Sequence, residues 1–271
     1  MKLRNISAAL SNPSLGIEYL VWRIAQARSG NATFTLSNGA KIGNFVNFSE
    51  YHSMVGCISS AEQHFFLDRV ADTPGDIIDI GANVGIVSVL LARQFPERTV
   101  HAIEPAPGTF AALGKNIALN DLRNVQAHQL AIADAPGSLS FNADPIQRAT
   151  ARIATADDTH VRTVSATTLD QFVADQAITA LALLKIDVEG FESLVFAGAR
   201  QTLARRLPRI IFMEVCPPLT RSAGFDPAEP ARIVEAAGYA WFRLEDSGEL
   251  VPVMPAQSDE VELENWVALP A

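Results

Sequence analysis

The chain has 271 residues, of which 48% are hydrophobic and 19% are charged, and its formal net charge at pH 7 is −9. This balance supplies enough apolar residues for a sizeable core and argues against a disordered chain. It also argues against a nucleic-acid partner, because phosphate backbones are bound by clustered Lys and Arg.

The apolar runs and the cysteines bear on location. No apolar run reaches the roughly 18 residues of a membrane span, and no continuous apolar segment precedes Asn12, as a signal peptide would require. The two cysteines, Cys57 and Cys216, lie far apart and show neither metal-ligand spacing nor a disulfide framework. We therefore expect a cytoplasmic protein without a membrane partner.

The elements before residue 74 are expected to form an extension, residues 1–73, packed on a catalytic domain, residues 74–271. Residues 14–28 have apolar side chains at helical spacing. Residues 32–36 and 40–46 flank Ser37-Asn38-Gly39 and predict a hairpin, and a further helix begins at Ser60. An alternative for the first helix is a lid or a contact in a homodimer.

From Asp76 onward, predicted strands and helices alternate. Such alternation produces a largely parallel sheet with helices on both faces. The predicted strands cover residues 76–80, 99–104, 124–130, 180–187, 208–215, 239–244 and 263–268, and the predicted helices cover 84–95, 107–119, 168–174, 190–204 and 227–237. We therefore expect an α/β fold with a doubly wound, mostly parallel seven-stranded sheet.

Residues 135–163 interrupt this alternation. Residues 137–141 and 160–164 are expected to form a pair of strands, and the polar residues 142–159 form a long connection between them. Long connections are often binding loops or lids.

A short glycine-bearing turn follows the first strand of the alternating region. The turn, residues 81–85, has fewer glycines than the G-x-G-x-x-G turn that cradles a pyrophosphate. Asp79 would repel a phosphate and favours a cation. S-adenosylmethionine carries an ammonium group and a sulfonium and no phosphate, so the turn favours this cofactor, with Asp79, Gly81, Asn83 and Gly85 around its methionine part. Asn83 alternatively stabilises the turn itself.

An acidic residue ends the next predicted strand. Glu104 lies 25 residues after Asp79, close to the ~20 expected for an acid that binds a ribose. A carboxylate accepts hydrogen bonds from both ribose hydroxyls. The alternative role is a cap for the helix over residues 107–119.

Five segments occur in an order typical of one enzyme family. They are Asp79–Gly85, Glu104-Pro105, Ala131–Asp134, Thr168–Asp170 and Leu184–Glu192. In this set the chain resembles the FkbM-type methyltransferases, a branch of the class I S-adenosylmethionine-dependent enzymes, over about residues 40–268.

The resemblance implies a Rossmann-like fold with an antiparallel final strand and S-adenosylmethionine as the cofactor. It places Leu130 and Ala131 near the adenine and adds Pro105, beside Glu104, to the residues that bind the cofactor. It also implies an O-methyltransferase that acts on a hydroxyl of a small molecule such as a sugar or a natural product.

Methyl transfer to a hydroxyl requires loss of a proton, so a base or a metal ion near the transferred methyl is expected. Asp187, at the end of the strand over 180–187, is the first candidate, and its alternative role is to cap the next helix, as Glu189 also would. Glu214 ends a neighbouring strand. Together Asp187 and Glu214 would bind a divalent metal or share a proton, or else form a structural pair with a basic residue. Lys185 is expected to neutralise nearby carboxylates.

Two other functions remain open at this point. One is a binding module that keeps the fold without transferring methyl groups, and the other is an NAD(P)-dependent oxidoreductase. Acceptor specificity is expected to lie in the N-terminal 60 residues, in residues 142–160 and in residues 216–226.

Overall fold

The computed structural model of the chain describes residues 13–143, 152–154 and 160–271. The predicted N-terminal helix, hairpin and second helix are confirmed, and one helix is additional. This helix, α3, begins where the Asn47 side chain accepts a hydrogen bond from the Glu50 backbone N–H at 2.9 Å. The elements are α2 (Pro13–Ser29), β1 (Phe34–Thr35), β2 (Lys41–Ile42), α3 (Phe48–Met54) and α4 (Ser60–Ala71).

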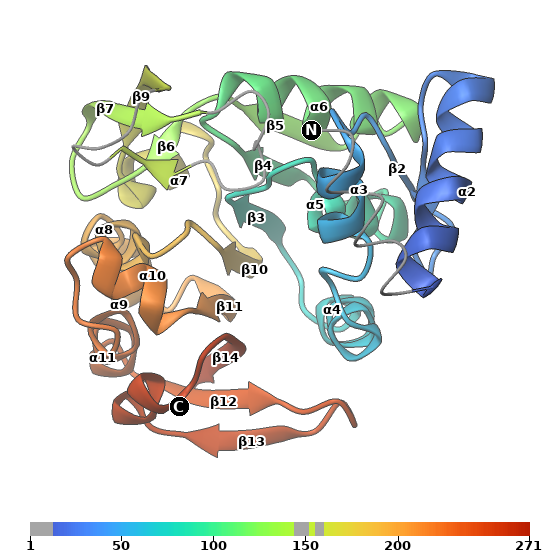
Figure 1. Ribbon diagram of the computed structural model, residues 1–271. Helices are drawn as coiled ribbons and strands as arrows, with labels where there is room; N and C mark the ends of the chain where they lie inside the picture. Colours follow the sequence, from blue (N-terminus) through green and yellow to red (C-terminus); the bar gives the residue numbers. More distant parts are fainter. Residues whose placement is uncertain (1–12, 144–151, 155–159) are drawn as a thin grey trace.

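An eight-stranded sheet forms the centre of the fold, with strand order β13-β12-β14-β11-β10-β3-β4-β5 (Figure 1). The strands from β11 to β5 pair in parallel, and β14 runs antiparallel to both of its neighbours. The strands are β3 (Asp76–Ile80), β4 (Val100–Ile103), β5 (Val125–His128), β10 (Leu181–Ile186), β11 (Pro208–Val215), β12 (Tyr239–Leu244), β13 (Leu250–Val253) and β14 (Glu264–Pro270).

The prediction of seven strands is therefore one strand short. The additional strand, β13, folds back on β12 as an antiparallel hairpin at the edge of the sheet, with Pro252 opposite Phe242. Its short sequence contains a proline, which weakens a strand prediction.

The helices cover both faces of the sheet, as predicted (Figure 1). The expected helix over residues 190–204 is wrong in one respect, because it is split into α8 and α9. Gly198 ends α8, and a Cβ there would lie 2.1 Å from the Ala133 carbonyl oxygen. The helices are α5 (Ile86–Gln94), α6 (Pro107–Leu119), α7 (Leu169–Asp175), α8 (Glu192–Ala197), α9 (Arg200–Ala204), α10 (Pro217–Ser222) and α11 (Glu229–Ala236), with a 3-10 helix η2 (Pro255–Glu260).

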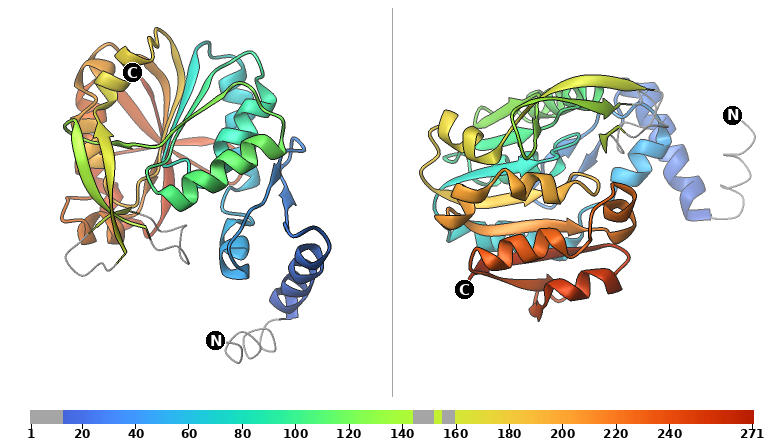
Figure 2. Two further views of the ribbon diagram at one scale, coloured as in Figure 1. Left: turned by 90° about the horizontal axis from the view of Figure 1, so that it is seen from above. Right: turned by 90° about the vertical axis from the view of Figure 1, so that its left-hand side faces the viewer.

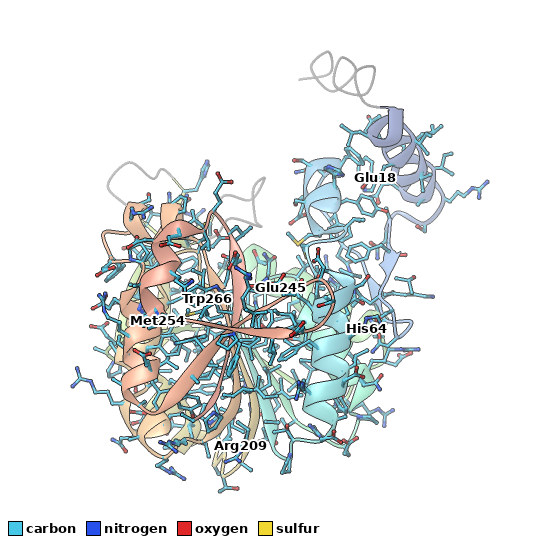
Figure 3. The ribbon with its side chains drawn as sticks, turned by 90° about the horizontal axis from the view of Figure 1, so that it is seen from below. Glu18, His64, Arg209, Glu245, Met254 and Trp266 are labelled. Carbon is cyan, nitrogen blue, oxygen red and sulfur yellow. The ribbon has the colours of Figure 1, made fainter. Side chains whose placement is uncertain are left out.

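Two apolar cores lie on opposite faces of the sheet, because successive strand residues point to opposite sides. Ile77 and Leu183 belong to the core under α4 and α5, whereas Ile78 and Leu184 belong to the core under α8 and α11. Trp266 of β14 is fully buried and lies among the strands (Figure 3).

A smaller four-stranded sheet, with order β6-β9-β7-β8, contains the predicted strand pair. β7 and β9 are antiparallel, and Ser140 lies opposite Thr163. Residues 144–151 and 155–159 of the predicted polar connection lie outside the described residues. The strands are β6 (Ala131–Ile132), β7 (Gly137–Asn142), β8 (Arg152–Ile153) and β9 (Val161–Thr167).

The helix α2 projects from the rest of the chain (Figure 2). Its inner face packs on α3, where the ring centroids of Tyr19 and Phe48 are 5.0 Å apart and the carboxylate of Glu18 lies 2.9 Å from His52 Nδ1. No helix of the described residues has both the length and the apolar character to cross a membrane.

Asn116 of α6 joins the N-terminal elements to the sheet. Its fully buried side chain accepts a hydrogen bond from the Gly43 backbone N–H at 3.0 Å and donates one to the Val84 carbonyl at 2.8 Å. We expect Asn116→Ala to lower the free energy of unfolding by about 2–4 kcal/mol, because it leaves buried polar groups without partners. Urea unfolding measures the loss, and Lys115→Ala, an exposed change on the same helix, should alter stability little.

Candidate functional site

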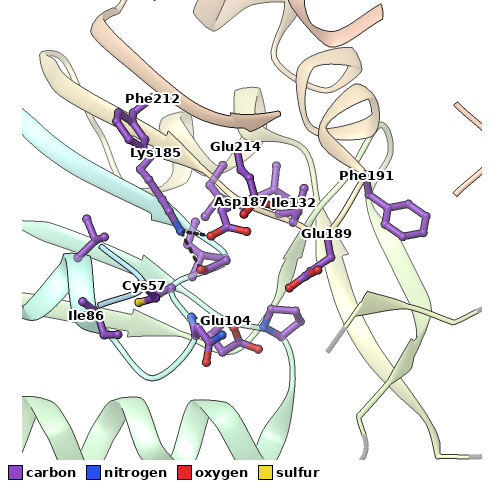
Figure 4. Close-up of a pocket in the computed structure, with 18 of the residues that line it drawn as sticks. Cys57, Ile86, Glu104, Ile132, Lys185, Asp187, Glu189, Phe191, Phe212 and Glu214 are labelled. Carbon is purple, nitrogen blue, oxygen red and sulfur yellow. Dashed lines mark hydrogen bonds and ion pairs between the residues drawn. The ribbon is translucent and has the colours of Figure 1, made fainter. Parts of the chain in front are cut away.

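A cavity opens at the carboxyl ends of β3, β4, β10 and β11, where ligands bind in open α/β sheets (Figure 4). The predicted residues Gly81, Asn83, Glu104 and Lys185 line it. The connection between α3 and α4 and the small sheet supply a second wall, with residues Met54, Cys57, Ile58, Phe141 and Ile153.

The turn after β3 has the left-handed backbone that its glycines predict. Gly81 has a φ of 75°, and Asn83 has a φ of 52°. A Cβ on Gly81 would lie 1.7 Å from the Asp187 carbonyl oxygen, so no side chain fits there. Gly85 does not appear among the described residues that line the cavity, and it lies against Leu113 instead.

Asp79 occupies a position different from the expected one. Its side chain is fully buried and is absent from the described cavity lining. Its carboxylate accepts a hydrogen bond from the Ser88 hydroxyl at 2.6 Å and lies 3.3 Å from the Lys185 ammonium. The Asp79 carboxylate therefore faces Ser88 and Lys185 and not the cavity.

Glu104 is buried at the end of β4, within the cavity wall. Its Oε1 accepts a hydrogen bond from the Ala106 backbone N–H at 2.8 Å, and its Oε2 accepts one from the Asn83 backbone N–H at 3.0 Å. Burial raises the pKa of Glu104 to about 7, although these two bonds act in the opposite direction. Ala106 is the N-cap residue of α6, so the bond from its N–H to Glu104 agrees with the capping alternative and leaves a second role toward a ligand open.

Apolar residues border the cavity beside Glu104. Pro105 follows it directly, and Leu130 and Ala131 lie at the start of β6, all three on the cavity wall. Ala131 is buried, whereas Leu130 is partly exposed. These side chains offer a flat heteroaromatic ring an apolar surface, next to a carboxylate that can accept hydrogen bonds.

Lys185 connects the buried interior with the cavity. Its Nζ lies 3.3 Å from Asp79 and 3.3 Å from Asp187, and it donates a hydrogen bond to the Gly81 carbonyl at 3.1 Å. Burial alone would lower the pKa of Lys185, but Asp187 and Asp79 raise it above its usual range. Lys185 is therefore a permanent cation here and does not act as a base.

Glu214 lines the same cavity from the neighbouring strand β11. Burial raises its pKa to about 9, and the negative charges of Asp187 and Glu189 add to this effect. At neutral pH its carboxyl group is protonated, so it is able to donate a hydrogen bond and does not accept a proton. No three His, Cys, Asp or Glu side chains are grouped to hold a metal ion within the described ranges.

The turn after β10 and the start of α8 contain two acids that the sequence analysis did not assign to the site. Glu189 lines the cavity, whereas Glu192 is 3% exposed and accepts hydrogen bonds from the backbone N–H groups of Val188 and Gly190. Helix α8 has Phe191 at its N-cap without a side-chain cap, so neither Asp187 nor Glu189 caps it. Glu192 holds the turn by accepting the N–H of Gly190. An acid two residues after a glycine is the sequence signal for this role.

Of the regions expected to set acceptor specificity, the N-terminal one lines the cavity and residues 216–226 do not. Met54, Cys57 and Ile58 place the N-terminal region on the cavity wall. No described residue of 216–226 lines the cavity, although Leu219 of α10 lies against Gly190.

Comparisons with known proteins identify relatives of this chain. The family described as "Methyltransferase FkbM domain" matches residues 79–240. "31-O-demethyl-FK506 methyltransferase FkbM" of Streptomyces tacrolimicus is 29% identical over 210 residues, which are 66% of this chain and 80% of that protein. "Methyltransferase 1" of Beauveria bassiana is 29% identical over 161 residues, 50% of this chain, and the match spans 65% of its own length.

Solved structures are more distant. A "Precorrin-6y C5,15-methyltransferase" from Geobacter metallireducens matches with a TM-score of 0.43 and 12% identity, and the match covers 78% of this chain and 88% of that one.

Proposed function

Because the chain belongs to the FkbM methyltransferase family, we propose that it transfers the methyl group of S-adenosylmethionine to a hydroxyl group of a small molecule, such as a sugar or another natural product. The observation that carries this proposal is Glu104, a buried carboxylate at the end of β4 whose oxygens lie in the cavity wall.

The described residues fit this donor. Glu104 would accept hydrogen bonds from the ribose hydroxyls, and the apolar residues Pro105, Leu130 and Ala131 would contact the adenine. The turn from Gly81 to Asn83 would hold the methionine part. When bound, S-adenosylmethionine supplies an electrophilic methyl group on a positively charged sulfur. The only lysine or arginine in the described cavity lining is Lys185, which is paired with carboxylates, so a pyrophosphate finds no free cation there.

The chain's own acids would serve the acceptor. Asp187 and Glu214 line the cavity from neighbouring strand ends. Lys185, held by Asp79, fixes the Asp187 carboxylate by an ion pair at 3.3 Å. Glu214, protonated at neutral pH, would donate a hydrogen bond to an acceptor oxygen. The transfer itself is accelerated by holding the acceptor oxygen in line with the methyl group.

Binding and transfer test the proposal separately. We expect calorimetry to show binding of S-adenosylhomocysteine, and a thermal-shift screen to show stabilisation by it and none by NAD(P). Mass spectrometry would then follow methylation of a panel that contains neutral sugars and 31-O-demethyl-FK506. Stabilisation by NADP without any by S-adenosylhomocysteine would contradict the proposal, and binding without methylation of any acceptor would favour the non-catalytic alternative.

A further inference from the structure

The turn between β10 and α8 is fixed by its surroundings. A Cβ on Gly190 would lie 2.6 Å from the backbone of Leu219, so α10 approaches the turn as closely as its backbone permits. The carboxylate of Glu192 accepts hydrogen bonds from two backbone N–H groups of the turn, including that of Gly190 at 3.2 Å. The turn is therefore held in one conformation without a ligand.

This turn imposes a strained backbone on Glu189. The φ of Glu189 is 56°, in the left-handed region, which a glutamate rarely adopts. Gly190 follows with a φ of 96°, where glycine is the natural residue. Strain of this kind persists where the surrounding structure imposes it, and it directs the Glu189 side chain into the cavity, toward the space between Asp187 and Glu104 (Figure 4).

The carboxylate of Glu189 differs from those of Glu104 and Asp187 in having both oxygens free. Glu104 accepts two backbone hydrogen bonds, and Asp187 is paired with Lys185 at 3.3 Å. In the described part of the chain, the Glu189 carboxylate has no hydrogen-bond or ion-pair partner within bonding distance. Its lone pairs are therefore available to a ligand.

The neighbouring acids are less suitable as proton acceptors at neutral pH. The ammonium of Lys185 lies 3.3 Å from Oδ2 of Asp187, so one oxygen of that carboxylate is already engaged in an ion pair. Glu214 is protonated, as described above, and has no acceptor capacity left for a second proton. Glu189 therefore combines a carboxylate free of protein partners among the described residues with a position in the cavity.

We propose that Glu189 is the catalytic residue that accepts the proton of the acceptor hydroxyl. This inference rests on the proposed function. The acceptor oxygen forms a bond to the methyl carbon, and the carbon–sulfur bond of the donor breaks with its electron pair left on sulfur. The hydroxyl proton passes to a Glu189 oxygen, so the products are a methyl ether, S-adenosylhomocysteine and a protonated carboxyl group.

The charges around Glu189 give the reaction a pH dependence. Burial first, then Asp187 and Glu192, raise the pKa of Glu189 to about 7. The positive charges of Lys185 and Arg152 act in the opposite direction, and Glu214 faces the same group from β11. Because the base must be deprotonated, the rate should rise with pH through about 7.

Glu189→Gln tests the inference at constant donor binding. General bases contribute typically 10²–10⁴-fold, so we expect this change to lower methyl transfer about 100-fold or more and to remove the rise with pH. The Glu189→Gln variant should bind S-adenosylhomocysteine as tightly as the wild type does. The Glu104→Ala variant, in contrast, should bind it more weakly. Glu189→Asp should restore part of the rate. Glu235→Gln, at an exposed residue of α11, should leave the rate and the pH profile unchanged.

A second measurement needs no acceptor. In protein labelled with ¹³C at the glutamate carboxyl carbons, the resonance that Glu189→Gln removes should titrate near pH 7 by NMR. A titration near the ordinary glutamate value would overturn the inference, as would a Glu189→Gln enzyme with the wild-type rate and pH profile. If no acceptor of the panel is methylated, the proposed acceptor class is wrong. The NMR titration still decides whether Glu189 has the basicity that a proton acceptor requires.

Discussion

Replacing Glu104 by alanine should weaken the binding of S-adenosylhomocysteine about 100-fold or more. Hydrogen bonds to a charged group contribute roughly 1.5–3 kcal/mol each, and the variant loses those to both ribose hydroxyls. It also frees the Asn83 N–H that Glu104 holds at 3.0 Å, so the turn that carries the methionine part is less ordered. Calorimetry measures the change, and Glu249→Ala, an exposed change on the hairpin of β12 and β13, should bind as wild type.

Wild-type affinity in the Glu104→Ala variant would show that the donor binds elsewhere.

The carboxylate of Glu104 also gives the free energy of unfolding a pH dependence. The pKa of Glu104 is raised to about 7 in the folded chain, above its value in the unfolded chain, so the folded state holds its proton longer. The stability of the wild type relative to Glu104→Gln should therefore fall as pH rises from about 5 to 8, by up to roughly 3 kcal/mol. Urea unfolding at several pH values without cofactor checks this sign.

Replacing Gly81 by alanine should prevent stable folding or cost about 3 kcal/mol or more. The added Cβ would lie 1.7 Å from the Asp187 carbonyl oxygen, and both groups belong to backbone at the ends of paired strands, so neither moves cheaply. The φ of 75° adds strain for any residue with a Cβ. Chemical unfolding followed by circular dichroism measures the loss.

Gly114 provides the matched control for this change. It lies within α6, its added Cβ would meet nothing within 4 Å, and alanine is favoured over glycine in helices by about 1 kcal/mol. Gly114→Ala should therefore be neutral or stabilising. Equal stability of the Gly81→Ala protein and the wild type would mean that β3 and β10 do not approach as closely as described.

The sheet was predictable from sequence where a strand is buried on both faces. Leu183 and Ile211 sit in continuous apolar runs, residues 181–184 and 210–213, which parallel strands covered by helices require. The predicted limits of β3 and β11 agree with the structure. The hairpin strand β13 was missed because it is short and contains Pro252. The break between α8 and α9 was missed because it depends on the approach of Ala133 to Gly198, a contact between distant segments.

The site was predictable in position but not in the direction of each side chain. Residues at the carboxyl ends of parallel strands meet at one edge of the sheet, and this places Glu104, Asp187 and Glu214 in one cavity. Lys185 pairs with two carboxylates, as expected. Alternation along a strand does not say which partner a carboxylate will face, so the hydrogen bond from Ser88 to Asp79 was not foreseen. The left-handed backbone of Glu189 arises from packing against α10 and has no local signature.

Pro252 lies in the edge strand β13 and affects how this sheet can pair with a second chain. An open sheet leaves a row of unpaired backbone groups along its outermost strand, and a second chain can add to such a row. Pro252 of β13 has no N–H to donate to an incoming strand. Strand addition along this rim of the sheet is thereby less favourable, which counters stacking into fibres along that side.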